Sequence, residues 1–165
     1  MNSQLTQLAG SADGRYFSGD ERNQLMSFAN SMPKRVAAAD ALAQHEDAVI
    51  RAVIEQMQQR FPNFARHHDQ AWARQFRDVQ LVVRADAQAM IFDDLRRLDD
   101  KVLFWLRTVF AASNYTPGFV RDCFESLRDQ LRSKLNRDEF DLLQPYLNRN
   151  VEVLSDFPEP PVPAV

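Results

Sequence analysis

Apolar side chains recur at helical spacing along almost the entire chain, and this pattern restricts the possible folds more than any other feature. One stretch repeats with the 3.6-residue period that puts its apolar residues on one helix face, at Val49, Ile50, Val53, Ile54 and Met57. Valine, isoleucine and threonine never form the alternating runs that strands need, and glycine occurs only 4 times. We therefore expect an all-α domain without a sheet.

Capping residues and prolines indicate where the helices begin and end. Ser18 and Glu21 have the spacing of a capping box, Thr116 precedes a proline at a first helical position, and Asn136 is a further N-cap. Pro33 is taken as the start of a new helix. These signals predict seven to nine helices. Helices are expected over residues 4–11, 34–43, 47–61, 68–97 (with a bend near residues 92–94) and 99–112. Three others are expected to start at residues 18, 117 and 136.

The C-terminal segment has a different composition from the rest. Four prolines occur in the eight residues after Asp156, and such a segment cannot form a helix. We expect one domain over residues 1–155 and a disordered proline-rich tail over residues 156–165.

Charge and hydropathy exclude several classes of function. The formal net charge is −3, so no overall positive field favours nucleic acid or an anionic membrane. The N-terminus is too short and polar for a signal peptide, and no apolar stretch approaches about 18 residues. The single cysteine, Cys123, excludes an intrachain disulfide and is interpreted as a small buried helix residue. We expect a cytoplasmic protein that binds neither nucleic acid nor membranes.

No residue pattern indicates catalysis. The chain has no glycine-rich phosphate loop and no cluster of cysteines and histidines. Cys123 stands among apolar residues with no histidine nearby in sequence, so it is a poor candidate nucleophile. We expect the protein not to be an enzyme.

Four segments, in order and at matching spacing, resemble the phycobiliprotein (phycobilisome protein) family. Residues 12–18 are similar to the family's Ala-Asp…Gly-Arg-aromatic-x-Ser turn in a shortened form, and residues 60–62 are similar to its segment ending in Phe-Pro. Residues 74–78, followed by Arg84, are similar to its central motif (Lys/Arg)-Cys-x-Arg-Asp with a later arginine, and residues 99–117 keep its length up to a Ser/Thr-Pro cap. The resemblance covers about residues 5–153. It implies a globin-like fold preceded by two N-terminal helices.

The resemblance also implies a pigment site in which one element is missing. In the family, the motif cysteine forms a thioether to a bilin, and this chain has Gln75 there. The family aspartate that bonds the pyrrole nitrogens is retained as Asp78, and the basic residues that meet the propionates are retained as Arg74 and Arg77. A bilin held without a covalent bond is therefore implied.

One branch of the family matches this pattern. Bilin biosynthesis-associated globins lack the attachment cysteine and accompany haem oxygenases and bilin reductases. The resemblance to them implies a role in bilin biosynthesis, with these enzymes as candidate partners.

Aromatic residues supply candidate walls for a flat ligand. Trp72 and Trp105 are assigned to the cofactor site, within an aromatic set that is otherwise interpreted as core. The charged residues have a simpler interpretation too, because Arg74 and Asp78 have the i,i+4 spacing of an ordinary ion pair on a solvated helix.

Two further alternatives stay open. Haem is the first, but residues 99–113, which include the helix expected over residues 99–112, contain no histidine, and this argues against ordinary globin ligation. The histidines are His45, His67 and His68, and the adjacent pair either supplies an axial ligand or belongs to a solvated helix start. The second alternative is a pigment-free subunit with a structural or regulatory role in an assembly.

A homodimer is expected through the two N-terminal helices. In the family these helices pack against a partner subunit, and an aspartate of the first turn pairs with the arginine after the pigment motif. Asp13 and Arg84 occupy those places here. A short helical hairpin buries little within its own chain, so its apolar residues need a partner surface.

Overall fold

The computed structural model describes residues 2–64 and 70–160, which contain helices and no strand. The elements are α1 (Ser3–Ser11), α2 (Gly19–Arg60), α3 (Ala71–Phe92), α4 (Leu95–Leu98), the π-helix η2 (Asp99–Leu103), α5 (Phe104–Ala112), α6 (Pro117–Lys134) and α7 (Arg137–Leu154). Because α4, η2 and α5 follow one another directly, the described residues form six continuous helical segments. The all-α prediction is confirmed, and the predicted count of seven to nine helices is too high.

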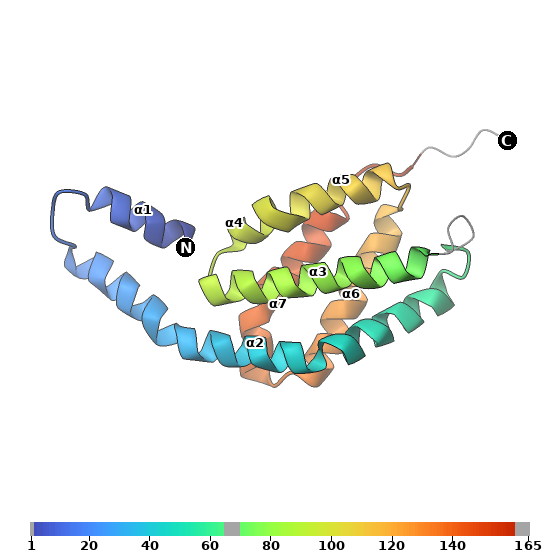
Figure 1. Ribbon diagram of the computed structural model, residues 1–165, viewed down its shortest axis with the longest axis horizontal. Coiled ribbons are helices and arrows are strands. Elements are labelled where there is room, and N and C mark those ends of the chain that lie inside the picture. Colours follow the sequence, from blue (N-terminus) through green and yellow to red (C-terminus); the bar gives the residue numbers. More distant parts are fainter. Residues whose placement is uncertain (1, 65–69, 161–165) are drawn as a thin grey trace.

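The count is too high because α2 is one helix of 42 residues where three were predicted. Pro33 lies inside α2 and removes one backbone hydrogen bond. Pro33 and Ala29, whose carbonyl would have accepted that bond, are both exposed, so water can satisfy the carbonyl. No glycine or proline follows before Arg60, and the helix continues past Asp47. Figure 1 shows α2 as a bowed helix along one side of the molecule.

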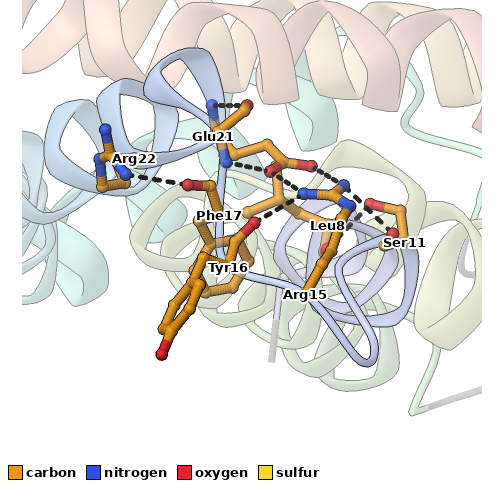
Figure 2. A network of polar contacts seen from close by, with 8 residues as sticks. Leu8, Ser11, Arg15, Tyr16, Phe17, Glu21 and Arg22 are labelled. Carbon is orange, nitrogen blue, oxygen red and sulfur yellow. Dashed lines mark hydrogen bonds and ion pairs between the residues drawn. The ribbon is translucent and has the colours of Figure 1, made fainter.

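The turn between α1 and α2 is held by a network of polar contacts around Arg15 (Figure 2). The guanidinium of Arg15 donates to both carboxylate oxygens of Glu21, at 2.7 and 2.8 Å, and to the carbonyl of Ser11. Ser18 and Glu21 form the predicted capping box at the start of α2. The hydrogen bond from Arg15, followed by that from the Ser18 backbone, lowers the pKa of Glu21 to about 2.

The end of α3 differs from the predicted helix over residues 68–97. Asp93 adopts a left-handed conformation, with φ 53°, and α3 stops at Phe92. The N–H groups of Asp93 and Asp94 donate to the carbonyls of Met90 and Ala89, which is the Schellman pattern. The expected bend is therefore a complete helix end, made by one of the few non-glycine residue types that tolerate this conformation.

Asp94 then caps two helices. Its carboxylate accepts from the N–H of Arg97 at the start of α4, at 3.2 Å, and from the N–H of Ser3 at the start of α1, at 2.8 Å. The side chain of Asn2 also donates to the carbonyl of Asp93, at 3.0 Å. These contacts anchor the N-terminus of α1 at the α3–α4 corner, as Figure 1 shows.

The core lies where α2, α3, α6 and α7 cross. Figure 1 shows α6 and α7 as a pair running across α3, and both pack against α2. The predicted caps of the pair are confirmed: the Thr116 and Asn136 side chains accept from the N–H groups of Phe119 and Glu139. Among the described residues, no helix is long and apolar enough to cross a membrane.

The segment after α7 has no helix as far as residue 160, and residues 161–165 lie outside the described range. Its start is not detached from the domain. Phe157 packs against the core, and Arg107 reaches Asp156 at 3.3 Å.

A polar pair is buried between α3 and α7. Asp86 and Asn150 are both fully buried, and the Asn150 amide donates to one Asp86 oxygen at 2.7 Å. The other Asp86 oxygen and the Asn150 carbonyl oxygen have no hydrogen-bond partner among the described residues. Burial raises the pKa of Asp86 well above its ordinary value, and the Asn150 hydrogen bond only partly opposes this. A protonated Asp86 would offer an O–H donor close to the Asn150 carbonyl oxygen, which has no donor among the described residues.

We predict that Asp86→Asn stabilises the protein increasingly as the pH rises from about 5 to 8. The raised pKa means that folded Asp86 keeps its proton while unfolded Asp86, with a pKa of about 3.9, loses it. The wild type therefore loses up to about 1.4 kcal/mol of stability per pH unit in that window, and an amide does not. Urea unfolding of both proteins across this pH range measures the difference. A constant difference would mean that Asp86 is ionised in the fold.

Candidate functional site

A cavity of about 820 Å³ opens where the end of α2, the first half of α3 and the α5–α6 turn meet. Three groups of residues line it: the end of α2 and the segment after it (Arg60, Phe61, Pro62, Asn63, Phe64), one face of α3 (Ala71, Arg74, Arg77, Asp78), and the α5–α6 region (Val109, Phe110, Ser113, Asn114, Tyr115, Thr116, Phe119). Its size falls in the usual range for small-molecule sites.

One side of the cavity is an aromatic wall, formed by Phe61, Phe64, Phe110, Tyr115 and Phe119. The rings of Phe64 and Phe119 stack at 4.3 Å, and Tyr115 stacks on Phe110 at 4.9 Å. Phe61 meets Phe119 edge to face at 5.1 Å. Because rings from three chain segments brace one another, through two stacked pairs and several edge-to-face contacts, the wall is a preformed apolar surface.

The charged groups of the cavity come mainly from α3. The Asp78 carboxylate pairs with Arg77 at 3.1 Å, while the side chain of Arg77 is 72% exposed and that of Asp78 only 13%. Arg74 lines the cavity one turn before Asp78, and Arg60 contributes a third guanidinium, 3.3 Å from Asp122. The structure therefore places three arginines and one recessed carboxylate beside the aromatic wall, and Asp78 pairs with Arg77 rather than Arg74.

The two tryptophans assigned to the site lie elsewhere. Trp72 does not line the cavity but packs behind the wall, with its ring 4.6 Å from that of Phe64. Trp105 is 55% exposed on α5 and is not a lining residue. The structure thus brings together Asp78, Arg74 and Arg77, with Trp72 in support, and leaves Trp105 outside.

Tyr115 is a cavity residue that is not among the site residues predicted from the sequence. It follows α5, where Asn114 is left-handed with φ 58°. The N–H groups of Asn114 and Tyr115 donate to the carbonyls of Ala111 and Phe110, a second Schellman pattern. The Schellman pattern commonly includes an apolar contact between the residues that correspond here to Phe110 and Tyr115. Asn114, a residue type that tolerates the left-handed conformation, is therefore the sequence signal that could have indicated the contact of Tyr115 with Phe110.

Gln75, which the resemblance aligns with an attachment cysteine, is turned away from the cavity. It is fully buried, and its amide lies 3.3 Å from the sulfur of Cys123 on α6. Cys123 is thus a spatial neighbour of the attachment position despite its distance along the chain. Burial raises the pKa of the Cys123 thiol to about 12, so it is neither accessible nor ionised.

No histidine lines the described part of the cavity, where it could serve as an axial ligand to haem iron. His45 lies in α2 and does not line it, whereas His67 and His68 lie outside the described residues. Over residues 2–64 and 70–160, no group of three or more His, Cys, Asp or Glu residues could hold a metal ion.

The family model described as phycobilisome protein matches residues 8–154, which is most of the chain and includes every residue of the cavity. No curated protein matches the chain.

We predict that Cys123 is inert towards thiol reagents in the folded protein. With a pKa near 12, its thiolate fraction at pH 8 is about a thousandfold below that of a free cysteine, and no path reaches the sulfur. Reaction with DTNB in buffer and in denaturant tests this. In a Cys123→Ala background, Ser113→Cys supplies an exposed thiol at the cavity rim as the positive control. Equal rates for the two cysteines in the folded state would contradict the prediction.

Proposed function

The chain belongs to the phycobilisome protein family, and from this membership we propose that it is a non-enzymatic protein that binds a linear tetrapyrrole (bilin) without a covalent bond. Proteins of this family bind bilin chromophores, and the all-helical structure is consistent with the family's globin-like fold. The proposed role is in bilin biosynthesis, where the protein holds the pigment between a haem oxygenase and a bilin reductase.

The cavity is the observation that carries the proposal. A bilin has a flat conjugated ring system, N–H donors and two propionates, and it supplies the visible absorption when bound. The aromatic wall suits the ring faces. The recessed Asp78 carboxylate accepts from pyrrole N–H groups, and Arg74 and Arg77 bind the propionates through charge-assisted hydrogen bonds.

The buried contact between Gln75 and Cys123 supports the non-covalent mode of the proposal. An amide cannot form a thioether, and the only thiol of the chain is fully buried and protonated. Pigment would therefore separate from the chain when the protein is unfolded.

We predict that biliverdin or phycocyanobilin binds with a shifted, sharpened absorption band, and that Asp78→Asn weakens this binding by about 1–3 kcal/mol. A neutral amide accepts weaker bonds from pyrrole N–H groups and removes the opposite charge. Absorption titrations of the wild type and the variant measure both effects. Gel filtration of the complex in acid urea should separate pigment from chain.

The exposed Asp100 gives the matched control, Asp100→Asn. Asp94 would be a poor control, because it caps α1 and α4. Equal weakening by both variants would mean that Asp78 has no specific role. A spectral change with haemin alone would favour a haem-binding globin, and no change with any tetrapyrrole would favour a pigment-free assembly subunit.

We further propose that two chains form a homodimer through α1 and the first half of α2. This part of the molecule extends away from the helices of the core (Figure 1). It exposes large apolar side chains, with Tyr16 97%, Met26 60% and Val36 41% accessible. A two-fold interface would bury these residues twice and would place Asp13 beside Arg84 of the partner subunit.

We predict that Asp13→Arg converts the dimer to a monomer. In the single chain Arg84 already makes a bidentate pair with Glu46, at 2.8 to 3.2 Å, while its side chain stays 60% exposed. Glu46→Gln is therefore the control, since it weakens the intrachain pair and should leave the dimer intact. Light scattering at tens of micromolar measures the mass. A monomeric wild type would end the proposal, and a dimeric Asp13→Arg variant would discard only the ion pair.

A further inference from the structure

Tyr115 carries the single polar atom of the aromatic wall, because its four partners in the wall are phenylalanines. The charged groups of the cavity lie on α3 and at the end of α2, whereas the α5–α6 region adds only the neutral polar residues Ser113, Asn114 and Thr116 around the wall. The Tyr115 hydroxyl is thus a hydrogen-bonding group set within a surface that otherwise offers only packing.

The position of Tyr115 is fixed by the chain around it. Its N–H donates to the carbonyl of Phe110 at 3.1 Å, and its ring stacks on that of Phe110. The rings of Phe64 and Phe119 meet it edge to face, at 5.2 and 5.5 Å. A ring held on three sides presents its hydroxyl in one direction without a large loss of entropy on binding.

The hydroxyl is also poised to donate. Burial, and then the charge of Asp78, raise the pKa of Tyr115 to about 12, so the group keeps its proton at any physiological pH. The structure gives this hydroxyl no hydrogen-bond partner among the described residues. A donor in a cavity that has no partner among the residues the structure describes is a place where a ligand acceptor gains binding energy.

We propose that Tyr115 is a specificity-determining residue that distinguishes linear from cyclic tetrapyrroles by donating a hydrogen bond to a terminal lactam carbonyl. The inference rests on the proposed function of the same cavity. Linear tetrapyrroles end in lactam rings with carbonyl groups, and haem has no such group. Both kinds of ligand carry two propionates, so Arg74 and Arg77 cannot distinguish them, whereas Tyr115 can.

The test compares dissociation constants for biliverdin and haemin in the wild type and in Tyr115→Phe, which keeps the ring and removes the hydroxyl. We expect about tenfold weaker binding of biliverdin and unchanged binding of haemin, corresponding to the loss of one hydrogen bond. Tyr115→Leu removes the ring as well and should weaken both ligands. Tyr16→Phe, at a residue that is 97% exposed, is the matched control and should change neither.

Folding is monitored separately from binding. The urea unfolding midpoint of Tyr115→Phe should equal that of the wild type, because the hydroxyl has no partner in the described structure. If Tyr115→Phe leaves biliverdin binding unchanged, or weakens both ligands equally, the role of the hydroxyl is refuted while the proposed function survives. If the wild type binds no bilin, the proposed function and this inference fail together.

Discussion

Five apolar side chains of α2, between Val49 and Met57, pack against α3, α6 and α7 and are at most 8% exposed. Burying each such side chain contributes about 1.5–3 kcal/mol, so this stripe is a large part of what holds the helices together. It also fixes the direction of α2, whose last turn leads into Phe61 and Phe64. The aromatic wall of the cavity therefore depends on a core contact that does not itself touch the cavity.

α3 connects the core to the cavity by using different faces for each. Val79, Val82 and Val83 are buried, while Arg74, Arg77 and Asp78 line the cavity. Gln75 lies on the buried side, against Cys123. A cysteine at that position would meet the core in this structure, so both the residue type and the packing around it oppose a thioether bond to a ligand in the cavity.

The helix boundaries show how far local signals extend. The starts of α2, α6 and α7 were predicted from Ser18, Thr116 and Asn136, because an N-cap satisfies backbone N–H groups with its own side chain. At Asp93 the sequence predicts a bend where α3 in fact ends, and at Pro33 it predicts a helix start where α2 in fact continues. In both cases the outcome depends on surroundings that the sequence does not display: a left-handed residue stabilised by hydrogen bonds, and a proline on an exposed face.

The sequence by itself determined the all-helical fold, the family and the charged residues that α3 brings to the cavity, because periodicity, caps and the spacing of Arg74, Arg77 and Asp78 are local along the chain. Arg60, the third guanidinium of the cavity, was added by the tertiary structure. Only the tertiary structure decided which aromatic residues join that group. It brought Phe61, Phe64 and Tyr115 to the cavity and left Trp105 outside, since helical spacing places a ring on a face but does not say what that face meets. It likewise paired Gln75 with Cys123, and Asp86 with Asn150, because contacts between distant segments follow from the packing of whole helices.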